Sequence, residues 1–149
     1  MSISKAAIAD RLFLERLVNV TDSTYAAGAD VISGLSKQPK TLPAKYFYDD
    51  YGSELFEQIC DLPEYYLTRT ETLILRNCAN EIAGITGACE IVELGSGSAV
   101  KTRILLDAYK EMHYPLHYLP IDISAGILES SAFALLNDYP TLKVRGLVG

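Results

Sequence analysis

The stretch 90-EIVELGSGSAVKTRILLDAY-109 combines a short apolar run, two glycines separated by a serine, and a second apolar pattern with helical spacing. The run Glu90–Leu94 predicts a buried β-strand, and residues 101–112 predict a helix. Gly95 and Gly97 fall between them, where glycine reaches backbone angles that other residues avoid and lets a ligand approach the main chain. The following helix directs its free N–H groups at the same point. The stretch therefore predicts a strand–loop–helix unit with a ligand-binding loop.

The residues that follow continue to alternate between strand and helix patterns. Strands are expected at 116-LHYLPIDI-123 and 142-LKVRGLV-148, and Ser124 is expected to cap a helix over 125-AGILESSAFALLNDY-139. This βαβαβ order predicts an α/β fold with three parallel strands and right-handed crossovers, which is an incomplete Rossmann-like sheet. Because helices cover both faces of such sheets, we expect the N-terminal part, another chain or a second copy to cover the remaining surface.

The pattern before residue 88 is different and predicts a separate N-terminal helical region over residues 1–87. Residues 88–149 are then the first half of a nucleotide-binding domain. Apolar residues at helical spacing indicate two amphipathic helices, around Ile8, Leu12 and Leu17 and around Tyr25, Ile32 and Leu35. The segment 37-KQPKTLPAKYFYDDYGS-53 is rich in proline and aromatic residues and predicts a structured loop.

Two further helices are expected between this loop and Gly87. Ser53 is expected to cap the first, which ends at Pro63. Thr68, followed three residues later by Glu71, fits a capping box that opens the second helix. The buried face of the second helix is expected at Leu75, Cys78, Ala79 and Ile82.

The composition, with 49% hydrophobic and 21% charged residues, is that of a globular domain. The formal net charge of -6 argues against nucleic acid or an anionic membrane as a partner, because binding to phosphate groups needs a basic surface. The N-terminus carries charges and lacks the apolar core of a signal peptide, so we predict a cytoplasmic location. Cys60, Cys78 and Cys89 match neither a disulfide framework nor a metal motif, and they are expected to be buried apolar residues.

Asp122 ends the second expected strand, which lies beside the first in a parallel sheet. Its carboxylate is therefore expected near the glycine loop, where it can accept hydrogen bonds from the two hydroxyls of a ribose. A dinucleotide fingerprint has a small residue where this chain has Val100, whose branched side chain would crowd the helix against the strand, so NAD is disfavoured. We infer a nucleoside site, with a purely structural turn as the alternative.

Glu93 precedes Gly95 by two residues and completes the pattern E-x-G-x-G, which is typical of enzymes that use S-adenosylmethionine (SAM) as methyl donor. The amino-acid end of SAM carries a carboxylate, which Lys101 near the helix start is expected to neutralise. It also carries an ammonium group, from which Glu93 is expected to accept a hydrogen bond. The alternatives are a solvated helix charge for Lys101 and, for Glu93, a buried carboxylate that holds the amides of the loop.

Three stretches together are similar to one known family: 42-LPAKYFYDDYGSELFEQICDLPEYYLTRTETLIL-75, 92-VELGSGSAVKTRILLDA-108 and 118-YLPIDIS-124. In order and spacing, from about Pro39 to Gly149, the chain resembles the ergothioneine-biosynthesis L-histidine Nα-methyltransferases, which carry the histidine-specific SAM-dependent methyltransferase domain. The resemblance implies a class I methyltransferase fold in which Gly95, Lys101 and Asp122 contact SAM.

The resemblance also implies two substrate residues. Tyr65, the tyrosine of the LPEYY motif, is implied to line the pocket for a histidine-like amino acid. Tyr48, the tyrosine of the FYD motif, is implied to lie near the amine that is methylated. From the residues alone both are expected to be packed tyrosines, and this remains the expectation for Tyr46, Tyr51 and Tyr66.

Members of this family continue beyond the position of Gly149, with a Gly-Asp pair whose carboxylate holds the adenine. The resemblance therefore implies that these 149 residues carry part of the SAM site and one wall of the substrate site. We expect them to bind SAM weakly and to show little or no activity alone. Two alternatives stay open: a non-catalytic module that acts through protein–protein contacts, and a nicotinamide-dependent oxidoreductase, which Val100 disfavours.

Overall fold

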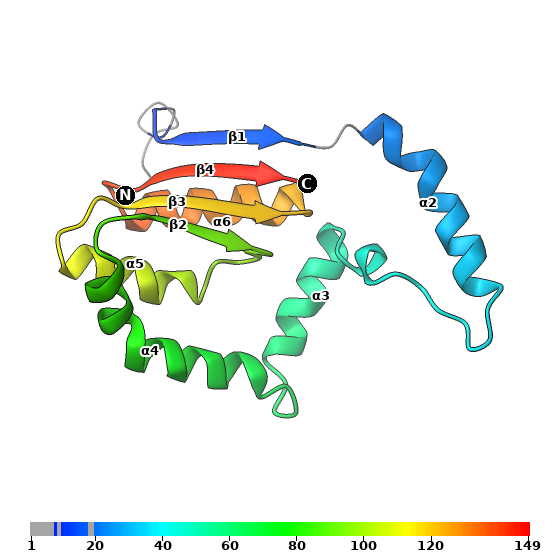
Figure 1. The fold of residues 1–149 in the computed structure, drawn as a ribbon, viewed down its shortest axis with the longest axis horizontal. Coiled ribbons are helices and arrows are strands. Elements are labelled where there is room, and N and C mark those ends of the chain that lie inside the picture. The colour runs from blue at the N-terminus through cyan, green and yellow to red at the C-terminus, as the bar shows by residue number, and fades with distance from the viewer. Residues whose placement is uncertain (1–7, 9, 18–19) are drawn as a thin grey trace.

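The computed structural model describes residues 8, 10–17 and 20–149 and contains one sheet of four parallel strands (Figure 1). In the order in which they pair, the strands are Leu12–Arg16 (β1), Lys143–Val148 (β4), His117–Asp122 (β3) and Glu90–Leu94 (β2). The α/β class and the three strands expected after residue 88 are confirmed. The expected total of three strands is wrong, because β1 comes from the N-terminal region.

β1 takes the place of the first expected N-terminal helix. The strand Leu12–Arg16 pairs in parallel with β4, with Leu14 opposite Gly146. The alternation of Leu12 and Leu14 also fits a strand, and the free edge of β4 offers hydrogen-bond partners that a period-based prediction cannot see. A Cβ on Gly146 would lie 2.6 Å from Leu14 Cδ2, so the glycine gives this leucine room beside β4. The helix predicted around Leu12 is therefore wrong.

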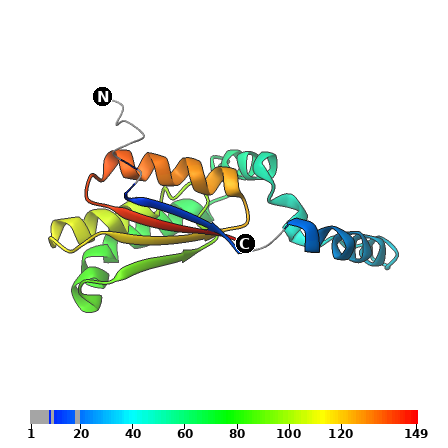
Figure 2. The same ribbon diagram turned by 90° about the horizontal axis from the view of Figure 1, so that it is seen from above.

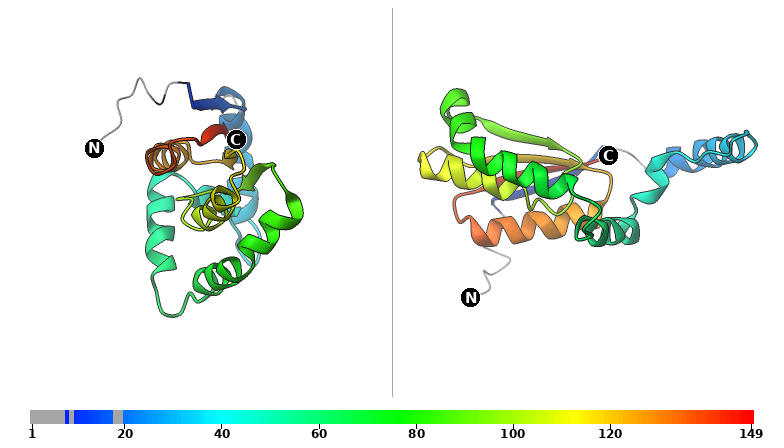
Figure 3. Two further views of the ribbon diagram at one scale, coloured as in Figure 1. Left: turned by 90° about the vertical axis from the view of Figure 1, so that its left-hand side faces the viewer. Right: turned by 90° about the horizontal axis from the view of Figure 1, so that it is seen from below.

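Three helices cover one face of the sheet: α4 (Leu67–Thr86), α5 (Thr102–Glu111) and α6 (Ala125–Asp138). Figure 3 shows all three on the same side of the strands. α4 contacts α5, and α6 contacts β3 and β4, with the space between them filled by fully buried leucines at Leu106, Leu128, Leu135 and Leu136. The opposite face carries none of the described helices, and on it Val92 and Leu94 of β2 are 58% and 79% exposed. Of the alternatives expected to cover the remaining surface, the described N-terminal residues do not cover this face, and cover by another chain or a second copy stays a prediction.

The second expected N-terminal helix is present as α2 (Val20–Leu35). Figure 2 shows that α2 projects away from the sheet, and its residues Ile32 and Leu35 are exposed, so the helix contributes little to the core. The predicted aromatic loop contains a 3-10 helix, η1 (Ala44–Phe47), and leads into α3 (Asp50–Cys60). Within the described residues, no helix is both long enough and apolar enough to cross a bilayer.

The starts of α3 and α4 differ from the predicted caps. Asp49 caps α3 instead of Ser53, because its carboxylate accepts a hydrogen bond from Gly52 N at 2.7 Å. α4 begins one residue before Thr68, so Thr68 lies inside the helix, and its hydroxyl donates to Cys60 Sγ at 3.4 Å. The predicted capping box at Thr68 is therefore wrong.

Beyond its start, α4 agrees with the prediction. Its less exposed face includes Leu75, Cys78, Ala79 and Ile82. Gly87 follows its last residue with a φ of 65°, a left-handed angle at which glycine commonly ends helices. The three cysteines are free, but Cys60 and Cys78 are only half-buried and Cys89 is exposed. Their predicted burial is therefore wrong.

Tyr139 joins the end of α6 to α5, because its hydroxyl donates to Asp107 Oδ1 at 2.8 Å. Burial, followed by this hydrogen bond, raises the pKa of Tyr139 to about 12 from an ordinary value of 10.0. The folded state therefore holds this proton more tightly than the unfolded state. The resulting stabilisation is complete below about pH 10 and is lost as the pH rises toward the folded pKa.

We expect the free energy of unfolding in urea to fall between about pH 10 and about pH 12, and to fall less in Tyr139→Phe than in the unsubstituted protein. The phenylalanine variant lacks the proton that is released. Equal decreases in the two proteins would show that Tyr139 does not contribute to the alkaline loss of stability.

Candidate functional site

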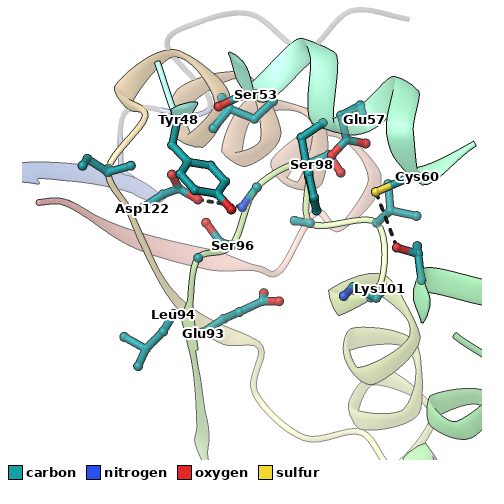
Figure 4. Close-up of a pocket in the computed structure, with 18 of the residues that line it drawn as sticks. Tyr48, Ser53, Glu57, Cys60, Glu93, Leu94, Ser96, Ser98, Lys101 and Asp122 are labelled. Atoms are coloured by element: carbon teal, nitrogen blue, oxygen red, sulfur yellow. Dashed lines mark hydrogen bonds between the residues drawn. The ribbon is translucent and has the colours of Figure 1, made fainter. Parts of the chain in front are cut away.

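A cavity of about 800 Å³ lies at the carboxyl ends of β2 and β3. Its walls come from α3, the first turns of α4, the loop of residues 95–101 and the turn after β3. Figure 4 shows Tyr48 and Asp122 on one side of the cavity, with Lys101 and Cys60 on the opposite side. The carboxyl edge of a parallel sheet is where open α/β folds bind ligands, so the cavity occupies the expected position.

The loop of residues 95–101 brings unobstructed main chain to this cavity. Gly95 and Gly97 have φ angles of 67° and 50°, and a Cβ on either would meet no atom within 4 Å. Gly95 N donates to Ile121 O at 2.8 Å, which fixes the start of the loop to β3. Ser96 Oγ is buried in the loop and has no hydrogen-bond partner among the described residues. Because the space beyond both glycines is open, a ligand can approach the backbone as predicted.

Asp122 links the glycine loop to the start of α6. Its Oδ2 accepts a hydrogen bond from Gly97 N at 2.8 Å, and its Oδ1 accepts one from Ser124 N at 2.9 Å. Ser124 in turn caps α6, as predicted, by accepting from Ile127 N at 3.4 Å. Asp122 therefore adjoins the glycine loop, and each of its carboxylate oxygens keeps acceptor capacity for a ligand.

Glu93 holds the floor of the cavity together. Its Oε2 accepts hydrogen bonds from Thr102 Oγ1 at 2.5 Å and from Tyr118 OH at 2.6 Å. Burial, with this hydrogen bond to Glu93, raises the pKa of Tyr118 above its ordinary value. Glu93 thus ties the start of α5 to β3 through side-chain hydroxyls, whereas the structural alternative had assigned it to the loop amides.

Lys101 lines the cavity and has a partner that was not predicted, and Val100 differs from its expected environment. Lys101 Nζ lies 2.5 Å from Glu71 Oε2 of α4, so this lysine is paired rather than solvated alone. Val100 is 60% exposed, and the crowding between helix and strand that was predicted from its branched side chain is wrong. The neighbouring Ala99 is buried instead, and it has a φ of 54°. Val100 therefore carries no argument against NAD.

Three aromatic side chains form the wall contributed by the N-terminal region. Phe56 of α3 stands between Tyr48, at a ring-centroid distance of 6.4 Å, and Tyr65, at 5.8 Å, and both contacts are edge-to-face. All three line the cavity, and neither tyrosine hydroxyl has a hydrogen-bond partner within the described part of the chain. The other tyrosines considered for this region, Tyr46, Tyr51 and Tyr66, lie outside the cavity lining.

One contact between α3 and the start of α6 was not predicted from the sequence. Ser124 Oγ donates to Asp50 Oδ1 at 2.8 Å, and a Cβ on Gly126 would lie 2.7 Å from the same oxygen. The aromatic wall is therefore anchored directly beside Asp122. The doubled aspartate before Gly52 was the available signal, but it does not indicate a contact across 74 residues.

Comparison with known proteins supports the family resemblance that was found in the sequence. Residues 27–149 match the family described as histidine-specific, SAM-dependent methyltransferases. The chain is 44% identical over 138 residues to a histidine N-alpha-methyltransferase of Mycolicibacterium smegmatis, an alignment that covers 93% of this chain and 43% of the relative. It is 47% identical over 120 residues to the histidine N-alpha-methyltransferase of Mycobacterium tuberculosis, with 80% and 37% covered. Against ergothioneine biosynthesis protein 1 of Neurospora crassa it is 38% identical over 112 residues, with 74% and 13% covered.

The chain spans about two fifths of the length of the two mycobacterial relatives. The family match confirms the predicted resemblance and the predicted cofactor, since the family is SAM-dependent. It extends over most of the 149 residues and includes the glycine loop, Asp122 and the aromatic wall. The chain therefore belongs to the family of histidine-specific, SAM-dependent methyltransferases.

Proposed function

We propose that the cavity binds SAM and that the site serves methyl transfer to the α-amine of L-histidine or a similar amino acid. The observation that carries this proposal is the continuity of one cavity, which joins the open glycine loop and Asp122 to the aromatic wall of Tyr48 and Tyr65. The finer fold assignment, an incomplete class I methyltransferase domain, is part of the same proposal. It is supported by the strand order and by the family match.

The residues present fit SAM. The unobstructed main chain at Gly95 and Gly97 accommodates the sulfonium part of the ligand, and Asp122 accepts hydrogen bonds from the ribose hydroxyls with its remaining lone pairs. Lys101 lines the same cavity and supplies a cation for the carboxylate of the amino-acid end, and Glu93 holds the floor beneath. When bound, SAM supplies an electrophilic methyl group.

The aromatic wall orients the amine that receives this methyl group. Tyr65 contacts the amino-acid substrate, and Tyr48 accepts a hydrogen bond from its amine, so that the nitrogen lone pair points toward the glycine loop. The amine must be unprotonated to use this lone pair. Positioning of this kind, together with the exclusion of water, lowers the barrier of a transfer between two bound groups.

A titration with three ligands tests the proposed function. By isothermal calorimetry we expect S-adenosylhomocysteine and SAM to bind, and NAD not to bind at ligand concentrations of about 1 mM. The glycine loop and Asp122 accommodate a nucleoside without a pyrophosphate, which the first two ligands share. Binding of NAD with comparable affinity, or no binding of either SAM ligand, would contradict the proposed function.

Methyl transfer by the 149-residue chain alone is expected to be slow. Tyr48, which lines the cavity, is 43% exposed, so water reaches the site. We propose that efficient transfer requires a further protein surface over this side of the cavity. Production of methylated histidine from radiolabelled SAM at a rate of about 1 s⁻¹ or more would contradict this expectation.

The exposed apolar face of the sheet favours a second candidate function, a non-catalytic module that binds a partner chain or a second copy. Val92 and Leu94 lie on this face without any helix from the described residues. Light scattering combined with the ligand titration separates the two functions. A dimer that does not bind S-adenosylhomocysteine supports the module, whereas ligand binding in any oligomeric state supports the methyl-donor site.

A further inference from the structure

The ion pair between Glu71 and Lys101 lies in the wall of the proposed SAM cavity. Lys101 immediately precedes α5, and Glu71 lies in the second turn of α4, so two different helices place the opposite charges 2.5 Å apart. Both residues line the cavity, and the side chain of Glu71 is 56% exposed. The pair therefore presents a cation and an anion side by side to any ligand in the cavity.

The amino-acid end of SAM has the complementary arrangement. Its ammonium and carboxylate groups are attached to one carbon, so the ligand also carries a cation and an anion side by side. A lysine ammonium has three donors and a carboxylate about four acceptor positions, which allows each residue to keep its partner and to bind one ligand group as well. We propose that Glu71 and Lys101 together bind this zwitterion, Glu71 the ammonium and Lys101 the carboxylate. This proposal rests on the proposed function.

Glu71 is better suited than Glu93 to bind the ammonium group. The sequence pattern had assigned this group to Glu93. One oxygen of Glu93 already accepts from the hydroxyls of Thr102 and Tyr118, which hold α5 and β3 in place. The hydrogen-bond partner of Glu71 in the described structure is Lys101. An ion pair as exposed as this one contributes little to folding, so a substitution of Glu71 reports on ligand binding rather than on stability.

Two ligands that differ in the amino-acid end test the proposal. S-adenosylhomocysteine has this end, and 5′-methylthioadenosine has the same nucleoside and thioether without it. By isothermal calorimetry we expect Glu71→Gln to weaken the binding of S-adenosylhomocysteine at least about tenfold. We expect Lys101→Ala to weaken it by a similar factor. The affinity for 5′-methylthioadenosine should change less than about twofold in both variants. Glu81→Gln is the matched control, because Glu81 is an exposed residue of α4 outside the cavity lining.

The outcomes separate this proposal from the one on which it rests. If Glu71→Gln binds S-adenosylhomocysteine as tightly as the unsubstituted protein, or more tightly, the zwitterion proposal is overturned. Glu71 would then only compete with the carboxylate of the ligand for Lys101. An equal loss for both ligands also overturns it, since the effect would then not involve the amino-acid end. If the unsubstituted protein binds neither ligand, the proposed function fails, and the role of the pair fails with it.

Discussion

Asp122→Asn is expected to weaken the binding of S-adenosylhomocysteine at least about tenfold and to destabilise the fold by about 1–3 kcal/mol. The carboxylate accepts backbone hydrogen bonds on both oxygens, from Gly97 N and from Ser124 N. An amide has one acceptor oxygen, so in either orientation its NH₂ group faces one of these N–H groups. The glycine loop or the start of α6 must then move, and both border the cavity.

Urea unfolding and calorimetry with S-adenosylhomocysteine measure the two effects of Asp122→Asn. Asp138→Asn provides the control, because Asp138 pairs with Arg103 at the exposed end of α6 and does not line the cavity. An exposed pair of this kind contributes at most about 1 kcal/mol. If Asp122→Asn and Asp138→Asn have the same stability and the same affinity, Asp122 does not organise the site.

Gly52→Ala is expected to displace the aromatic wall and to cost about 1–3 kcal/mol of stability. A Cβ at this position would run into the carbonyl oxygen of Phe47 and lie 2.8 Å from its carbonyl carbon, both of which are backbone atoms. A flexible side chain could yield, but here η1 and the first turn of α3 must separate. Tyr48 lies between these two elements, so its position in the cavity depends on this contact.

Gly28→Ala is the matched control for Gly52→Ala. Gly28 lies in α2, and a Cβ there would meet no atom within 4 Å. This substitution should stabilise the helix by about 0.5–1 kcal/mol. The chain contains no tryptophan, so its intrinsic fluorescence comes from ten tyrosines, of which Tyr48 and Tyr65 belong to the aromatic wall. Unchanged tyrosine fluorescence and unchanged stability in Gly52→Ala would contradict the close contact with Phe47.

The strands and helices of residues 88–149 could be predicted because the sequence patterns that specify them are local. The strand at Glu90–Leu94 appears with the predicted bounds, and Ser124 caps α6 as predicted. The N-terminal strand could not be predicted in this way. Residues 12–16 satisfy both a helical and an alternating pattern, and the choice between them depends on the free edge of β4, far away in the sequence.

The distinction between local patterns and contacts far away in the sequence also applies to the site. Gly95, Gly97 and Asp122 lie at the ends of neighbouring strands, and parallel topology alone places them together. The pairing of Lys101 with Glu71 depends on how α4 lies beside α5, which no local pattern specifies. The capping-box interpretation of Glu71 was wrong for this reason, since the residue contacts another helix rather than its own N-terminus.

The position of β1 also affects how the protein forms during synthesis. β1 and β4 meet across about 130 residues of sequence, as the ion pair between Glu15 and Arg145 shows. A ribosome adds about 5–20 residues per second, so β1 remains unpaired for roughly 10 s until β4 has been synthesised. Nascent chains with an uncovered apolar strand such as Leu12–Arg16 are targets for chaperones that bind extended peptides, and the sheet reaches its final order only after β4 has left the exit tunnel.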